Sequence, residues 1–282
     1  MSEQRAQTLE MGAVTLSVAD LPRSIAYYED TIGLLLRARA VGSAELGTER
    51  RSLLRLVERP GGPAAPGTPG LFHFALLVPN RQDLGRALAH FIEERVPLQG
   101  VADHIASEAL YLSDPDDHGI EIYRDRPQAE WQYEDGKLRM ATLPLDAQGV
   151  LEAGDPTQTS HELAPQTRMG HVHLRVSTLP PAARFFEQAI GLEIATTMPG
   201  ALFLASDGYH HHIGANVWQS RNRSARPAEG LGLERFEIII PADNDRAAIA
   251  GRARELGYAV VESERGPTLT GMDNILCELV AA

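Results

Sequence analysis

The chain has 282 residues, of which 43% are hydrophobic and 23% charged, an ordinary composition for a globular protein of one large or two compact domains. Its formal net charge of −12 and the lack of any lysine- or arginine-rich run argue against nucleic acid as a partner, and no apolar stretch approaches the roughly 20 residues of a membrane span. Residues 1–10 lack the apolar core of a signal peptide and a single cysteine excludes an intrachain disulfide, so we expect a cytoplasmic protein.

The chain repeats one unit four times, each a strand, a helix and three further strands in about fifty residues. In unit one, residues 13–18 form the first strand, and the helix that follows closes at Gly33, a residue type that commonly ends helices. Unit three repeats this order, since VTLSVADLPRSIAYYEDTIGLLL in unit one matches VHLRVSTLPPAARFFEQAIGLEI in unit three. The other first strands are predicted at 72–78, 171–176 and 235–240, and the helices after them at 81–94, 181–190 and 244–256.

A weakly patterned stretch separates units two and three. Residues 127–168 contain Pro, Gly, Asp and Gln with few apolar runs, which is typical of a linker. We therefore predict an N-terminal domain over residues 11–126, holding units one and two, and a C-terminal domain over residues 169–282, holding units three and four.

Histidines gather in two segments of unit three that have the pattern of strands. Because side chains alternate between the two faces of a strand, His171 and His173 share one face and the apolar residues between and after them take the other. The same alternation, applied to a last strand predicted over residues 210–218, places His210 and His212 on one face. Apolar residues take the core side, so the imidazoles face a cavity or solvent. Two adjacent strands arranged in this way predict a metal site or an acid–base site.

Four strings make a resemblance to a known family specific: HFALLVPNR, SEALYLSDPDDHGIEIYRDRP, GHVHLRV and GYHHHIGANVW. Together with the fourfold unit, they resemble the vicinal oxygen chelate superfamily, which includes glyoxalase I, fosfomycin resistance proteins and extradiol ring-cleavage dioxygenases. The chain is most similar to the catechol 2,3-dioxygenase branch. The resemblance implies an α+β fold in which four βαβββ modules form two paired curved sheets around central cavities, with helices outside.

The resemblance also implies a metal held by two histidines and one glutamate at first-strand and last-strand positions. The first-strand position falls on His73 in module two and on His171 in module three. The last-strand position falls on Glu121 in module two and on His212, or its neighbour His210, in module three. The expected ion is Fe(II), with Mn(II) as the second choice.

Modules one and four lack ligands at the matching positions. Their first strands carry Ala13 and Arg235 there, and the glutamate position of module four falls on Cys277. Glu278 lies one residue further along, so it is expected to face the other side of the sheet.

Because the ligands lie in modules two and three, we hypothesise that these two modules pair with each other and that modules one and four form the second pair. The segment 127–168 is long enough to connect modules that pair out of sequence order. His73, Glu121, His171 and His212 would then converge on one metal. The alternative is pairing in sequence order, one with two and three with four, which would leave a histidine-only cluster in the C-terminal domain.

The resemblance implies an extradiol dioxygenase that acts on a small catecholic substrate with O2, and a homodimer is left open as its assembly. His173 and His210 are the candidates for acid–base catalysis, and Tyr209 or Tyr123 for hydrogen bonding to substrate oxygens. His211 is expected to be structural, and His104 either lines a cavity or, as we expect first, is exposed. Glyoxalase-type lyase or isomerase chemistry and non-catalytic small-molecule binding remain alternatives on the same scaffold.

Overall fold

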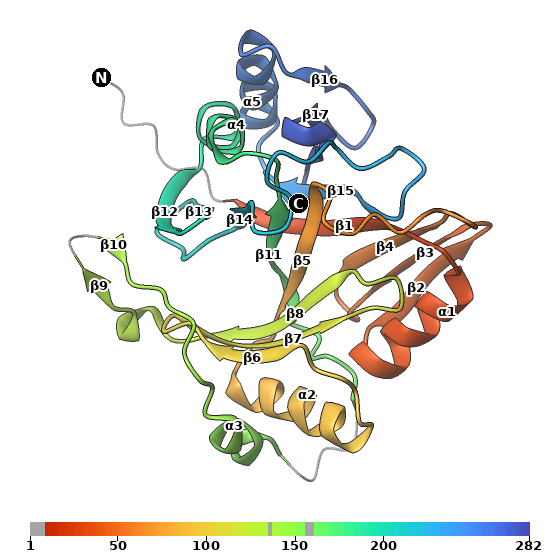
Figure 1. Cartoon of the computed structure of the whole chain (residues 1–282), viewed down its shortest axis with the longest axis vertical. Helices are drawn as coiled ribbons and strands as arrows, with labels where there is room; N and C mark the ends of the chain where they lie inside the picture. The colour runs from red at the N-terminus through yellow and green to blue at the C-terminus, as the bar shows by residue number, and fades with distance from the viewer. Residues whose placement is uncertain (1–8, 135–136, 156–160) are drawn as a thin grey trace.

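Two eight-stranded sheets dominate the computed structural model, which describes residues 9–134, 137–155 and 161–282 (Figure 1). Module one comprises β1 (Glu10–Val18), α1 (Leu21–Ala26), the π-helical η1 (Tyr27–Ile32), β2 (Leu35–Ala40), β3 (Ser43–Gly47) and β4 (Ser52–Glu58). Module two comprises β5 (Gly70–Leu77), α2 (Arg81–Glu93), β6 (Gly100–Asp103), β7 (Ser107–Ser113) and β8 (Gly119–Asp125). The predicted βαβββ order is confirmed in both.

Modules three and four repeat the same order after a connecting segment. The connection contains η2 (Gln128–Glu130), β9 (Tyr133–Glu134), β10 (Lys137–Leu138) and α3 (Ala147–Ala153). Module three comprises β11 (Arg168–Arg175), α4 (Leu179–Arg184), the π-helical η3 (Phe185–Ile190), β12 (Glu193–Met198), β13 (Ala201–Ala205) and β14 (Ile213–Asn216). Module four comprises β15 (Gly232–Ile239), α5 (Asp243–Glu255), β16 (Ala259–Val261), β17 (Thr268–Thr270), η4 (Met272–Asn274) and β18 (Leu276–Val280).

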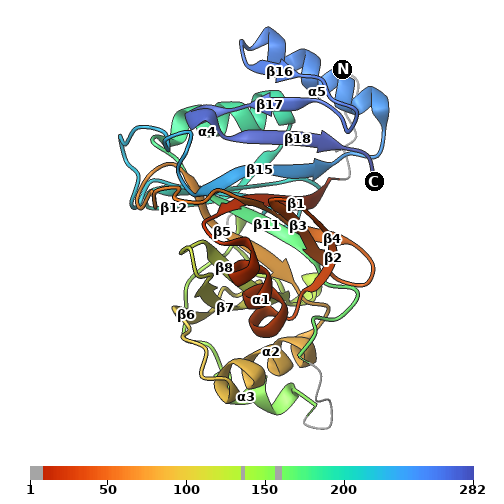
Figure 2. The ribbon, with the colours of Figure 1, turned by 90° about the vertical axis from the view of Figure 1, so that its right-hand side faces the viewer.

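The modules pair as the ligand distribution predicted. One sheet, here called the 2–3 sheet, has the order β12-β13-β14-β11-β5-β8-β7-β6, and the other, the 1–4 sheet, has the order β16-β17-β18-β15-β1-β4-β3-β2. Figure 2 shows the strands of the 1–4 sheet from β16 to β1 running side by side above the 2–3 sheet. The alternative, pairing in sequence order, is therefore wrong. Each sheet combines one module from residues 11–126 with one from 169–282, and the division into domains at those limits stays a prediction.

The sequence marks the ends of the helices. Asp20 accepts a hydrogen bond from the backbone N–H of Arg23 and so caps the start of α1. The helix of module one ends at Gly33 (φ 82°) and that of module three at Gly191 (φ 97°), both in the left-handed conformation that glycine adopts without strain. Both helix ends were predicted from the sequence.

One contiguous apolar core draws on both sheets and on the helices that cover them. Each first strand sends alternate apolar residues into it, and the intervening residues point to the opposite face. The fully buried members from the four first strands include Leu16, Phe74, Leu174 and Phe236, and those from the helices include Tyr28, Leu84, Phe186 and Ile249. The opposite face of each sheet does not enter this core and can carry polar side chains.

The last strand of module three is shorter than predicted. Strand β14 begins at Ile213, so residues 206–212 form the connection from β13 rather than a strand. Face alternation therefore does not apply to the histidines of this segment, and the prediction that His210 and His212 share a strand face is wrong. No helix among the described residues is long and apolar enough to span a membrane.

We predict that Phe236→Ala lowers the free energy of unfolding by about 3–5 kcal/mol, because the side chain is fully buried where the 1–4 sheet enters the shared core. Val41→Ala, at a fully exposed turn, is the control and is expected to change it by less than about 0.5 kcal/mol. Urea denaturation followed by circular dichroism measures both. Equal midpoints for the two variants would contradict the shared core.

Candidate metal centre

Three side chains of the 2–3 sheet converge on one point. His73 on β5, Glu121 on β8 and His171 on β11 are all buried, and their ligand atoms lie within 4.8 Å of one another. The Glu121 Oε2 atom is 2.9 Å from His73 Nε2 and 3.0 Å from His171 Nε2, and the two nitrogens are 3.3 Å apart. Modules two and three thus supply one compact set of two imidazoles and one carboxylate.

Strand register explains why these three meet. Strand β5 pairs in parallel with β8, with Ala75 opposite Glu121, and antiparallel with β11, with Ala75 opposite His171. The small Ala75 side chain therefore lies between the two residues, on the face away from the core. Gly170 is needed next to His171, since a Cβ there would lie 1.9 Å from the hydroxyl oxygen of Tyr123.

The protonation states suit metal binding. Burial alone would raise the pKa of Glu121, but the adjacent His171 and His73 imidazoles outweigh it and hold that pKa well below its usual range. Burial lowers the pKa of His171 to about 4, although Glu121 opposes this shift. A carboxylate beside a neutral imidazole is the form in which these groups coordinate metals.

The spacing of the three donor atoms also fits a metal ion. Three donors each about 2.1 Å from one ion, and at right angles to one another, would lie about 3 Å apart. The observed separations of 2.9, 3.0 and 3.3 Å match this spacing. Two histidines and one carboxylate on one side of an ion form the set that non-haem Fe(II) oxygenases use.

The cluster lies in a cavity of about 320 Å³ whose walls are mostly apolar and aromatic. Among the described residues that line it, none is lysine or arginine. The aromatic and methionine side chains of the lining are Phe72, Tyr111, Met140, Met198, Phe203 and Trp218. Met140 belongs to the segment after β10, so the predicted linker contributes to the cavity wall.

His104 and Tyr111 form a hydrogen-bonded pair in this wall. His104 Nδ1 is 2.7 Å from the carbonyl oxygen of Ala141, so this nitrogen donates, and Nε2 then accepts from the Tyr111 hydroxyl at 2.7 Å. Burial, followed by the Glu121 charge, raises the pKa of Tyr111 well above its usual value, which keeps the phenol neutral. Of the two positions expected for His104, the cavity wall is the one observed, and exposure is wrong. Alternation along β7 would have identified Tyr111, because it lies directly opposite Glu121.

His173 shares the cavity face with His171, as alternation along β11 predicted. The Asn216 carboxamide oxygen accepts from the backbone N–H of Trp218, which leaves its NH2 group to donate to His173 Nε2 at 3.0 Å. The proton of neutral His173 therefore lies on Nδ1. Gly214 makes room for the ring, since a Cβ there would lie 2.8 Å from the ring carbon Cγ of His173.

The other predicted site residues do not reach the three-residue cluster. His212 is buried outside it, with Nδ1 facing the backbone N–H of Ser206 at 3.4 Å. Tyr209 and His210 both hydrogen bond to Asp125 and do not line the cavity. The neighbour that does line it is His211, whose ring centre is 4.1 Å from that of His171. These positions follow from residues 206–212 being a loop.

The matching positions of the 1–4 sheet hold an ionic network instead. Strand register places Arg235 at the position of His73, and Glu278, which is opposite Glu237, at the position of Glu121. The assignment of the glutamate position to Cys277 is wrong, because Cys277 points into the core. The Glu278 carboxylate lies 3.9 Å from Arg235 Nη1 and 3.7 Å from Arg265 Nη1. Guanidinium groups have no lone pair for a metal, and no equivalent centre occurs in the described part of this sheet.

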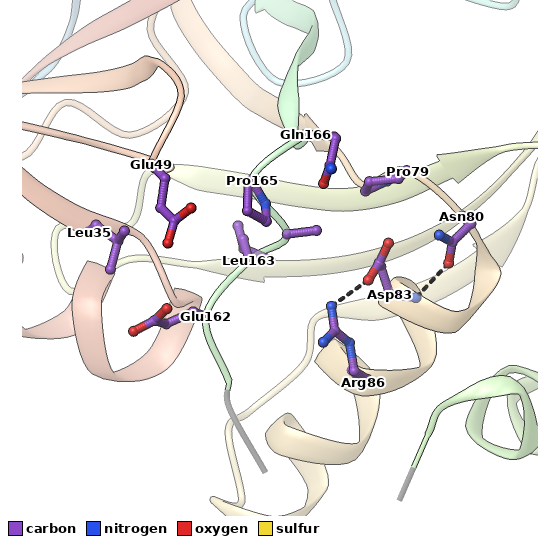
Figure 3. A pocket seen from close by; sticks show the side chains of 11 residues that line it. Leu35, Glu49, Pro79, Asn80, Asp83, Arg86, Glu162, Leu163, Pro165 and Gln166 are labelled. Carbon is purple, nitrogen blue, oxygen red and sulfur yellow. Dashed lines mark hydrogen bonds and ion pairs between the residues drawn. The ribbon is translucent and has the colours of Figure 1, made fainter. Parts of the chain in front are cut away.

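A larger surface cavity lies elsewhere. It measures about 600 Å³, is formed between β2, α2 and residues 162–166, and shares no lining residue with the cavity of the cluster. Figure 3 shows its polar wall, where Asp83 and Arg86 form an ion pair and Asn80 caps α2. None of the described residues that line it is a histidine, so its composition does not suggest a metal site.

Residues 10–122 match the model of the glyoxalase/bleomycin resistance protein/dioxygenase superfamily. The chain is 40% identical over 261 residues to the catechol-2,3-dioxygenase of Bacillus subtilis (strain 168), covering 90% of each chain. Among solved structures, a putative dioxygenase from Bacillus subtilis aligns with a TM-score of 0.67 at 15% identity, over 98% of this chain and 86% of the other. Glyoxalase I from Zea mays aligns with a TM-score of 0.57 at 16% identity, over 98% of this chain and 93% of the other. At these identities the two structures show the fold alone.

We predict that His73→Ala, Glu121→Ala and His171→Ala each weaken Fe(II) or Mn(II) binding by at least about tenfold, because each removes one of three ligands. His212→Ala is expected to retain the metal, and His90→Ala on α2 serves as a second control. Metal content after anaerobic purification and titration with Mn(II) measure the effect. Loss of metal in His212→Ala together with retention in Glu121→Ala would contradict the assignment.

Proposed function

Since the chain belongs to the glyoxalase/bleomycin resistance protein/dioxygenase superfamily, we propose that it is a metal-dependent extradiol dioxygenase that cleaves the ring of a small catechol with O2. The observation that carries this proposal is the set of His73, Glu121 and His171 on the floor of an aromatic cavity. The similarity to a catechol-2,3-dioxygenase over most of the chain supports it.

The three proposed ligands line the cavity together, so an ion that they held would face the space in which a substrate could bind. An iron ion held there would supply the remaining coordination positions, in which a diol and dioxygen meet. The chain's own contribution is to hold the carboxylate and both imidazoles in place before substrate arrives. Burial of all three excludes bulk water from the ligand atoms.

Two polar groups in the cavity wall can contact a bound diol. The Tyr111 hydroxyl gives its proton to His104, so its oxygen can accept a hydrogen bond from a substrate hydroxyl. His173 carries its proton on Nδ1 and can act as a donor. His104 and Tyr111 thus join His173 as candidates for binding and proton transfer, in place of Tyr209 and His210.

The composition of the cavity wall favours an uncharged substrate ring. Phe72, Phe203 and Trp218 provide apolar and aromatic surface, and no lysine or arginine among the described lining residues is present to pair with an anionic substituent. Burying an unpaired carboxylate costs several kcal/mol. We therefore expect alkyl-substituted catechols to be better substrates than carboxylated ones.

We predict that the Fe(II)-loaded protein consumes one O2 per catechol and forms a coloured ring-opened product. For 3,4-dihydroxybenzoate, kcat/KM should be at least about tenfold lower than for 4-methylcatechol, because its carboxylate would be buried without a partner. An oxygen electrode and absorbance spectroscopy measure both quantities. Glu121→Gln, which keeps the size of the side chain, is the matched inactive control.

Two results would contradict the proposal. Thiol-dependent turnover of a hemithioacetal without oxygen uptake would assign the protein to glyoxalase-type chemistry. Binding of the catechol by the metal-loaded protein, with neither oxygen uptake nor product, would assign it to small-molecule binding.

A further inference from the structure

A chain of hydrogen bonds runs from the cavity to a carboxylate that is not part of the proposed metal centre. His211 lines the cavity, and its Nδ1 atom is 2.7 Å from Nδ1 of His210. His210 Nε2 is 2.8 Å from Oδ1 of Asp125, at the end of β8. The other carboxylate oxygen of Asp125 accepts from the Tyr209 hydroxyl at 2.9 Å, and Tyr209 is in turn 2.8 Å from the Tyr123 hydroxyl.

The positions of the protons follow from which atoms can donate. A carboxylate only accepts, so His210 must carry a proton on Nε2 to bond Asp125. In a neutral imidazole the second nitrogen then bears a lone pair, so His210 Nδ1 accepts. Its partner, His211 Nδ1, must therefore be the donor. This leaves His211 Nε2 without a proton.

The surroundings of His211 hold its ring against the proposed metal ligands. Its ring centre lies 4.1 Å from that of His171 and 5.1 Å from that of Phe203, and the residue is buried. Because Nδ1 is engaged by His210, Nε2 is the ring nitrogen left for a molecule in the cavity.

We propose that Asp125 and His210 are positioning residues that keep the proton of His211 on Nδ1, so that Nε2 of His211 accepts a hydrogen bond from a ligand hydroxyl. Asp125 and His210 act through His211 and do not touch the ligand themselves. The role in catechol binding rests on the proposed function, whereas the proton position on His211 does not.

Control of the proton on His211 would give a role to the hydrogen bonds that join Asp125, His210 and His211. Without Asp125, His210 could carry its proton on either nitrogen, and His211 Nε2 would become a donor in part of the molecules. A donor at that position cannot accept the hydrogen of a diol. The Asp125 side chain is partly exposed, with 23% of it accessible. Burial therefore does not fix its carboxylate, which is held instead by hydrogen bonds from His210 and Tyr209.

Selective 15N labelling of histidine in the full-length protein loaded with Zn(II), which is diamagnetic, reads the proton position directly by NMR. His211→Gln identifies the signals of His211. We expect wild-type His211 to be protonated on Nδ1 alone, and both Asp125→Asn and His210→Ala to shift a measurable fraction of His211 to the Nε2-protonated form. A wild-type His211 protonated on Nε2, or a proton position unchanged in both variants, would overturn the proposal.

Asp114→Asn is the matched control, since it alters another carboxylate–histidine pair, Asp114 Oδ2 to His118 Nδ1 at 2.8 Å, outside the cavity. It is expected to lower thermal stability and leave the His211 signals unchanged. A change in His211 signals in this variant equal to that in Asp125→Asn would overturn the proposal, because it would mark a general structural effect.

Kinetics separates this inference from the proposed function. In the iron-loaded protein, Asp125→Asn should lower kcat/KM for catechol by about 10- to 100-fold with metal content unchanged, and Asp125→Glu should recover part of the loss. Loss of metal in step with activity would overturn the positioning role. If the wild type cleaves no diol, the proposed function fails, while the NMR result still decides the proton position on His211.

Discussion

The antiparallel pairing of β5 with β11 is the constraint on which the candidate centre depends. It joins module two to module three across the connecting segment, and it sets His173 opposite His73 and His171 opposite Ala75. Strand β8 then adds Glu121 from the other side of β5. Pairing in sequence order would have separated the carboxylate from one of the two imidazoles.

Burial of the Glu121 carboxylate is the energetically unfavourable part of this arrangement. An ionised group out of water must be compensated by hydrogen bonds or by opposite charge. In the 2–3 sheet, two imidazoles face Glu121, and a metal ion fits among the three. In the 1–4 sheet, Arg235 and Arg265 face Glu278 at the equivalent position. The same backbone frame thus holds a buried carboxylate twice, once with donors that bind metal and once with cations that exclude it.

Much of the fold and part of the candidate site could be predicted because strand alternation is a local property. It placed His171 and His173 toward the cavity, and the distribution of ligand residues among the modules was enough to predict which modules pair. Prediction failed where alternation does not hold. His210–His212 lie in a loop, so the wrong member of the run was expected at the cavity, and a one-residue error of register in β18 exchanged Cys277 with Glu278. For His104 both the cavity wall and exposure were open, because the carbonyl of Ala141 that fixes its ring comes from a segment without periodicity.

The most direct test of this account is the anomalous diffraction signal of crystals grown anaerobically with Fe(II), measured at the iron absorption edge. The account predicts one peak per chain among His73 Nε2, His171 Nε2 and Glu121 Oε2. A peak beside Glu278 in the 1–4 sheet, a peak bound only by His210–His212, or no peak in iron-loaded crystals would contradict it.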